Sequence, residues 1–227
     1  MRLNLATKVL IILVFGFQLN AQNDSISQNK KNSKVPFLFD DERQYFGAIS
    51  IAYQNPMSYG DNFIGEGFEG KGGYNFKFQI YVFKNFFVGF SYGFSNFNNI
   101  NTELLGNYTE STVEEISGVI GYEFIPLPKV RLGVNTSIFG NATLTNSIQS
   151  GYGNRDFGKL RNFGVTLEYE FVRNLNILLE YNWRKIKTDI RVPNELKSFF
   201  EEGTYNTLNV GLKFNFGSAA FTEKLSF

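Results

Sequence analysis

From residue 45 to residue 216, hydrophobic and polar residues alternate with a period of two, the pattern of β-strands whose two faces differ. In YNFKFQIYV at 74–82, for example, Tyr74, Phe76 and Phe78 share one face, and Lys77 lies on the other. We therefore predict an all-β fold with eight antiparallel strands of about nine residues or more, at 45–53, 74–82, 86–94, 116–124, 130–138, 163–171, 175–183 and 208–216.

The connections between these segments alternate between short and long. The short ones are 84–85, 126–129 and 173–174, and the long ones are 54–72, 96–110, 146–159 and 187–203. Short turns at one end and long loops at the other are typical of a transmembrane β-barrel. A strand of about ten residues with a rise of ~3.3 Å, tilted by ~40°, covers about 25 Å, the height of such a barrel's apolar band. The sequence thus predicts an eight-stranded antiparallel up-and-down transmembrane β-barrel with its long loops outside the cell.

The two faces of the strands have different chemistry. In the first segment, Tyr45 is expected on the apolar face with Ile49 and Ile51. The opposite faces carry small, polar and charged residues, which we assign to the lumen because an eight-stranded barrel is filled by side chains. The predicted lumen ion network has five acids and four bases, which nearly cancel: Lys77, Glu115, Glu123, Arg131, Glu168, Glu170, Glu180, Arg184 and Lys213. A soluble periplasmic ligand-binding β-barrel, with its apolar face inside, remains an alternative.

Within this network, Glu168, Glu180 and Lys77 each lie about six or seven residues from the short turns, so we expect them at similar heights. Two close carboxylates repel, and a cation between or opposite them would relieve the repulsion. Lys77 and Arg184 are the candidates for that cation.

The N-terminus has the features of a secretory signal. Arg2 and Lys8 precede an apolar run at 9–17 that is too short to span a bilayer, and Ala21 marks a plausible cleavage point. We predict a signal peptide at 1–21, a flexible periplasmic leader at 22–42, the barrel at 43–216 and a short tail at 217–227.

Composition narrows the possible chemistry. The 227 residues include no Cys and no His, so the commonest catalytic base and metal ligand are absent, and aromatic residues make up 17%. With 22 basic and 21 acidic residues, charge gives no reason to expect nucleic acid. No cofactor is indicated.

A glycine-rich stretch, GEGFEGKGG at 65–73, matches G-x-G-x-x-G and most of a phosphate loop. Both motifs need a helix after the loop, whereas an alternating strand pattern follows here, and Gly72 stands where the phosphate loop needs Ser or Thr. We interpret the glycines as turn formers in a surface loop, and expect no nucleotide.

The pattern resembles the eight-stranded outer-membrane β-barrels of Gram-negative bacteria, namely the transmembrane domain of outer membrane protein A and the outer membrane β-barrel family of Bacteroidetes. Asn209, Gly211, Phe214 and Phe216 are similar to that family's C-terminal assembly signal, although GSAAFTEKLSF follows it here. The resemblance implies an outer-membrane location, with membrane lipid and the barrel assembly machinery as partners.

These observations favour a non-enzymatic barrel that is structural, adhesive or a subunit of a surface or secretion complex, acting through its loops. In the last loop, Leu196, Phe199 and Phe200 have helical spacing and predict a short amphipathic helix that packs on the rim or binds a protein partner. A narrow outer-membrane transport channel is the alternative function. An enzyme built on a carboxylate pair such as Glu168 and Glu170 is less favoured than a structural ion pair.

Overall fold

A computed structural model describes residues 45–148, 151–217 and 220–222. The predicted signal peptide at 1–21 and leader at 22–42 lie outside the described residues. No helix in the described part of the chain is long and apolar enough to cross a membrane.

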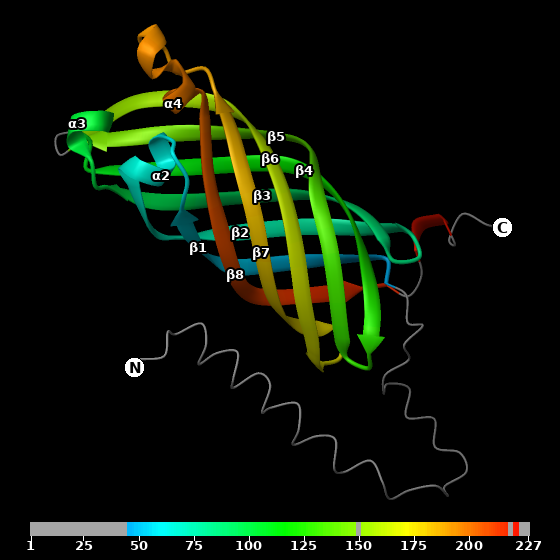
Figure 1. The fold of residues 1–227 in the computed structure, drawn as a ribbon. Coiled ribbons are helices and arrows are strands. Elements are labelled where there is room, and N and C mark those ends of the chain that lie inside the picture. The colour runs from blue at the N-terminus through cyan, green and yellow to red at the C-terminus, as the bar shows by residue number, and fades with distance from the viewer. Residues whose placement is uncertain (1–44, 149–150, 218–219, 223–227) are drawn as a thin grey trace, which may run out of the picture. The chain divides into compact units, whose positions relative to one another are not determined.

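Eight strands form a closed antiparallel barrel, which confirms the predicted fold class (Figure 1). Each strand pairs with the next along the chain, and β1 pairs with β8 to close the barrel. The strands are β1 (Gly47–Ser58), β2 (Phe68–Phe83), β3 (Phe86–Asn99), β4 (Glu110–Leu127), β5 (Val130–Ile148), β6 (Gly151–Val172), β7 (Leu175–Thr188) and β8 (Glu202–Phe216).

Three short turns connect strands at one end of the barrel. Each has one non-glycine residue in the left-handed region, Lys84, Lys129 and Asn174, with φ of 45°, 69° and 65°. Such residues let two strands reverse within a two-residue turn. The opposite end, called the loop end below, carries short helices: α2 (Phe63–Gly67), α3 (Thr102–Leu105), η1 (Asn194–Leu196) and α4 (Lys197–Glu201).

The strands extend further toward the loop end than the alternation of apolar residues indicated. The predicted loop at 146–159 is wrong, because β5 continues to Ile148 and β6 begins at Gly151. The predicted loop at 54–72 is also too long, since β1 reaches Ser58 and β2 starts at Phe68. Beyond the apolar band, outward positions of the strands become polar, so their composition there resembles that of a loop.

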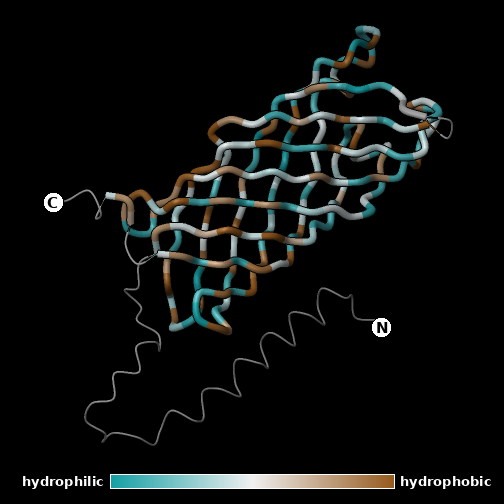
Figure 2. Tube along the Cα trace, turned by 180° about the vertical axis from the view of Figure 1, so that it is seen from behind, coloured by the Kyte–Doolittle hydropathy of each residue, from teal (hydrophilic) through white to brown (hydrophobic). Residues whose placement is uncertain are grey.

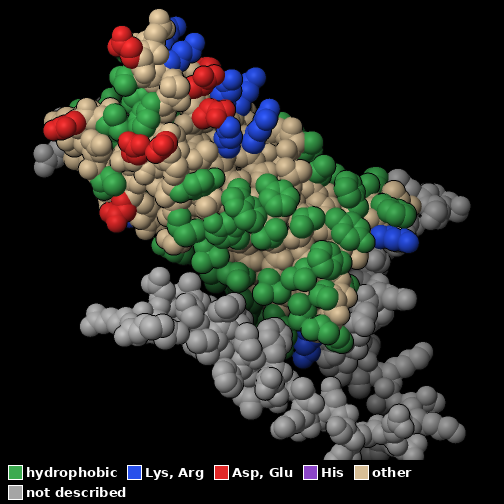
Figure 3. Space-filling view, viewed as in Figure 1, with side chains coloured by type: hydrophobic (Ala, Val, Ile, Leu, Met, Phe, Trp, Pro, Cys, Tyr) green, Lys and Arg blue, Asp and Glu red, His purple; other side chains and the backbone are tan. Residues whose placement is uncertain are grey.

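The exterior of the barrel is apolar in its middle. Outward residues such as Ile51, Tyr74, Ile177, Val210 and Phe214 are between 47% and 59% exposed. Hydropathy alternates from residue to residue along the strands (Figure 2), and hydrophobic side chains cover the visible middle of the barrel (Figure 3). This is the reverse of a soluble barrel, which hides its apolar face inside.

Tyr45 departs from its predicted face. It precedes β1 and is only 2% exposed, packed at the short-turn end with Tyr81, Phe87 and Val119. The prediction that Tyr45 shares the outward face is therefore wrong, because the strand pairing starts only after it.

Candidate functional site

The lumen is the candidate site, because the nine ionisable residues predicted to line it are all buried in the barrel interior. They come from six strands and lie at successive heights. Toward the short turns, Lys213 Nζ lies 2.5 Å from Glu123 Oε1 and 2.7 Å from Glu168 Oε1. Tyr81 donates to the other oxygen of Glu123 at 2.6 Å, and Asn176 donates to the other oxygen of Glu168 at 2.8 Å. One ammonium group thus pairs with two carboxylates from different strands.

Arg131 and Glu170 complete this layer. Arg131 lies 3.7 Å from Glu123, and its guanidinium lies 4.5 Å from the centre of the Tyr45 ring. The Tyr45 hydroxyl donates to Glu170 at 3.4 Å, and the backbone N–H of Asn174 donates to Glu170 at 2.8 Å. Glu170 therefore helps to hold the β6–β7 turn.

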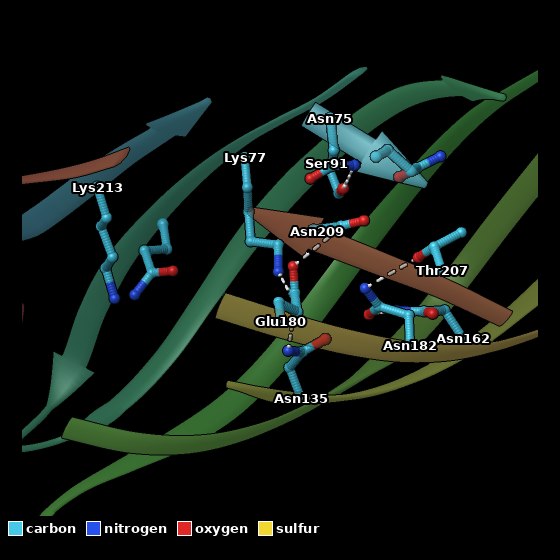
Figure 4. A network of polar contacts seen from close by, with 12 residues as sticks. Asn75, Lys77, Ser91, Asn135, Asn162, Glu180, Asn182, Thr207, Asn209 and Lys213 are labelled. Carbon is cyan, nitrogen blue, oxygen red and sulfur yellow. Dashed lines mark hydrogen bonds and ion pairs between the residues drawn. The ribbon is translucent and has the colours of Figure 1, made fainter. Parts of the chain in front are cut away.

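Lys77 and Glu180 form the next contact along the lumen (Figure 4). Asn135 and Asn209 donate to the two Glu180 oxygens at 2.9 and 3.3 Å. The expectation that one cation lies between or opposite Glu168 and Glu180 is wrong, because Lys77 contacts Glu180 whereas Glu168 pairs with Lys213. In the register, Glu180 faces Thr166, two positions from Glu168, so the carboxylates lie at different heights.

Arg184, our other candidate for that shared cation, pairs with Glu115 further toward the loop end. Gln54 accepts from Arg184 at 2.9 Å and donates to Ser95 at 2.6 Å. The Tyr205 hydroxyl also donates to Glu115. The assignment of Arg184 to the Glu168–Glu180 region is therefore wrong, because its height on β7 brings it to a different acid.

Above this pair, the lumen changes from polar to apolar. Inward residues of the strands and the helix α2 make a cluster that we call the apolar plug: Phe63, Ile64, Phe68, Phe97, Val113, Ala142, Leu144, Leu160, Ile186, Phe200 and Tyr205. Phe63 and Ile64 of α2 are 2% and 0% exposed. A cavity of about 10 Å³ beside α2 is at the lower limit for one water molecule.

Helix α2, and hence the apolar plug, was not predicted from the sequence. The local signal was Asn62, whose side chain accepts from the backbone N–H groups of Ile64 and Gly65 at 3.1 Å each. An Asn before an apolar pair is a helix N-cap signature. A five-residue helix containing two glycines has no apolar period that reveals it.

The glycine-rich stretch has a packing role in this region. A Cβ on Gly65 would lie 1.9 Å from the Gly60 carbonyl oxygen, and one on Gly70 would lie 1.9 Å from that of Pro56. Gly65 lies in α2 and Gly70 in β2, rather than in a loop that leads into a helix. Our interpretation of them as surface turn formers is thus corrected, because they are needed for close backbone approach.

The predicted helix in the last loop is present as η1 and α4. Phe200 is buried and stacks on Phe63 with ring centres 5.7 Å apart, so it belongs to the apolar plug. Phe199 packs partly against the plug, while Leu196 is 42% exposed. A hydrogen bond and the charge of Lys187 lower the pKa of Glu201 in this helix.

The short-turn end is also covered. Ala220, in the predicted tail, is fully buried against the cluster that contains Tyr45 and Tyr81. Thr222 donates to the carbonyl of Val82 at 2.9 Å. Residues 220–222 therefore pack on the barrel rather than leave it.

The residues that resemble an assembly signal divide between the two faces of β8. Asn209 lies inside on Glu180, and a Cβ on Gly211 would meet the Ile51 carbonyl oxygen at 2.1 Å. Phe214 is 50% exposed on the outside, and Phe216 stacks on Phe78 with ring centres 6.4 Å apart. β8 closes the barrel against β1.

No family model and no curated protein matches this chain. Among solved structures, it is similar to Neisserial surface protein A, with 10% identity, 75% of this chain and 97% of that one covered, and a TM-score of 0.53. It is also similar to Ail, the attachment invasion locus protein of Yersinia pestis (16% identity, 74% and 97% covered, TM-score 0.47). A third is the N-terminal β-barrel domain of Pseudomonas aeruginosa OprF (14% identity, 76% and 100% covered, TM-score 0.45). The likeness to the Neisserial protein shows a shared fold.

Fold and exterior together indicate a transmembrane β-barrel of the outer-membrane type. Side chains fill its lumen and satisfy one another's charges. Among the described residues, no group of three or more acidic side chains is placed to hold a metal ion.

Proposed function

We propose that this chain is a non-enzymatic outer-membrane β-barrel that does not conduct solutes and acts through its loop end, as an adhesive or structural surface protein or as a subunit of a surface complex. The observation that carries the proposal is the filled interior, in which the ion network lies below the apolar plug. In such an interior, Lys213 and Glu180 are 2% and 1% exposed. A channel for solutes needs a hydrated path along exposed polar groups.

The absence of His from the sequence supports a non-enzymatic role. Glu168 and Glu170 are held by Lys213, Tyr45 and the Asn174 backbone, which is the arrangement of structural carboxylates. The narrow transport channel remains the second candidate, since displacement of α2 would remove two apolar side chains from the loop end.

Kinship with the Bacteroidetes barrels and with the outer membrane protein A domain is part of the same proposal. It is supported by the aromatic C-terminal strand with Asn209, Gly211, Phe214 and Phe216. This strand would be the element that the barrel assembly machinery recognises.

The protein partner at the loop end is proposed to contact η1 and α4. Leu196 projects there with 42% of its surface exposed, although it is apolar. Figure 1 shows this segment standing out from the barrel's loop end.

Site-specific photo-cross-linking in intact cells tests this role. A photoreactive residue in place of Leu196 should give one discrete cross-linked species. The same residue in place of Ile100, which is 59% exposed at the same end, serves as the control and should not. Equal labelling from both positions, or none from either, would contradict a partner site at η1 and α4.

A further inference from the structure

Four basic side chains gather on the outside of β6 and β7 near the loop end. Lys159 lies opposite Lys187 in the strand register, and Arg161 lies opposite Lys185. All four are exposed and face outward. We call Lys159, Arg161, Lys185 and Lys187 the basic patch.

The basic patch carries uncompensated charge. Like charges directly opposite each other across two strands destabilise the pairing. Two of the four cations have acidic partners. Glu202 forms a salt bridge with Lys185 at 2.6 Å, and Glu201 forms one with Lys187 at 3.1 Å. Within the described residues, Lys159 and Arg161 have no carboxylate at ion-pair distance. Two positive charges therefore remain for a ligand.

The height of the basic patch matches a membrane interface. One outward position closer to the membrane centre, Phe163 and Trp183 lie side by side with ring centres 5.5 Å apart, and Tyr181 lies 4.7 Å from Trp183. Aromatic girdles mark the boundary between acyl chains and headgroups. The basic patch lies just beyond that boundary, and Figure 3 shows Lys and Arg side chains gathered beside the hydrophobic surface.

The charge is also one-sided. At the same end of β4, the outward residues Glu110 and Glu114 are acidic, and β5 carries the neutral Thr143 and Thr145. A uniform basic ring would serve only general adhesion to the bilayer surface. A cluster on two adjacent strands instead indicates a localised ligand.

We propose that the basic patch binds the phosphorylated headgroup of a membrane lipid in the leaflet around the loop end, with an acyl chain lying along Phe163 and Trp183. Phosphate suits the patch because Arg161 offers a fork of donors and the lysines add point charge. The apolar rings next to the cations favour a lipid over a soluble anion or a nucleic acid. This site rests on the proposed outer-membrane location.

Lipid retention by the full-length protein tests the site. The protein is refolded into phosphatidylcholine vesicles containing a minor fraction of either diphosphorylated lipid A or its dephosphorylated counterpart. It is then extracted in mild detergent, and the bound lipid is measured by native mass spectrometry. The wild type should retain the phosphorylated lipid selectively.

The informative variant is Lys159→Gln with Arg161→Gln, which removes the two unpaired cations. Each cation near an anionic headgroup contributes about fivefold, so apparent affinity should fall about 25-fold. The matched control is Lys71→Gln with Lys84→Gln, exposed cations elsewhere on the barrel, and should retain lipid like the wild type.

Equal retention by the Lys159→Gln/Arg161→Gln variant and the wild type would overturn the site while leaving the barrel intact. An equal loss in the control variant would also overturn it, because the attraction would then be general. Failure of the wild type to insert into pure phosphatidylcholine vesicles would overturn the outer-membrane proposal itself.

Discussion

Lys213 of β8 contacts two buried carboxylates, Glu123 of β4 and Glu168 of β6, so its charge links three strands across the lumen. Replacing it with Met should leave Glu123 and Glu168 without their ammonium and destabilise the barrel by about 3–5 kcal/mol. Urea unfolding in lipid vesicles measures this. The control Lys71→Gln breaks an exposed pair with Glu110 and should cost less than about 1 kcal/mol. A neutral Lys213→Met would contradict the network's structural role.

Val210 tests which face of the strands meets lipid. It is 50% exposed and pairs with Leu179 in the middle of the apolar run of β7. Val210→Lys should destabilise the barrel by about 2–4 kcal/mol in vesicles, because a charge at mid-depth faces hydrocarbon.

The matched control for Val210 is Asn55→Lys, at an exposed outward position closer to the loop end. It should cost less than about 1 kcal/mol. Equal effects of the two substitutions in the same unfolding assay would contradict an apolar belt with polar ends.

For single residues, the sequence predicts which side chains point inward but not which of them contact one another. Alternation alone placed Lys77, Glu180 and Lys213 on the lumen side. Their contacts depend on the stagger between strands. The bulge near Ile138, where Gly118 faces Phe139 but Val119 faces Ser137, changes the register of β5 against both its neighbours. No local pattern in the sequence reveals such a shift.

Among the secondary-structure elements, helix α2 closes the loop end of the barrel. Phe63→Ala should destabilise the protein by about 3–5 kcal/mol, because Phe63 is buried in the plug against Phe68 and Phe200. Leu196→Ala, at an exposed apolar position of the same end, should change stability by less than about 0.5 kcal/mol. The folded barrel migrates faster on a gel than the boiled protein, and the temperature at which this faster band disappears measures the stability of both variants. Similar midpoints for the two variants would mean that α2 does not pack as described.

Alternation of apolar and polar residues predicted some secondary-structure elements and not others. The eight strands and their faces were predicted because lipid-facing residues stay apolar over nine positions. The extensions of β5 and β6 were missed because their outward residues, such as Asn141 and Thr143, turn polar above the membrane. Helix α2 was missed because its length is below one amphipathic repeat.

For the whole molecule, the placement of the long connections at one end predicts that this end faces outside the cell. Trypsin added to intact cells should cut after Arg191 or Lys197, in the segment between β7 and β8. Arg173, in a short turn, should be protected until the cells are permeabilised. Immunoblotting of the fragments distinguishes these sites. Cleavage at Arg173 in intact cells with 189–201 untouched would reverse the orientation.

A lipid-embedded barrel whose lumen is filled by Lys77, Glu180 and their neighbours and capped by α2 should not conduct ions. Single-channel recording in planar bilayers tests it most directly, with folded protein whose faster migration before boiling verifies the barrel. We expect a baseline without conductance steps at any applied voltage. Stable, reproducible steps from the folded species would contradict the filled lumen and favour the transport channel.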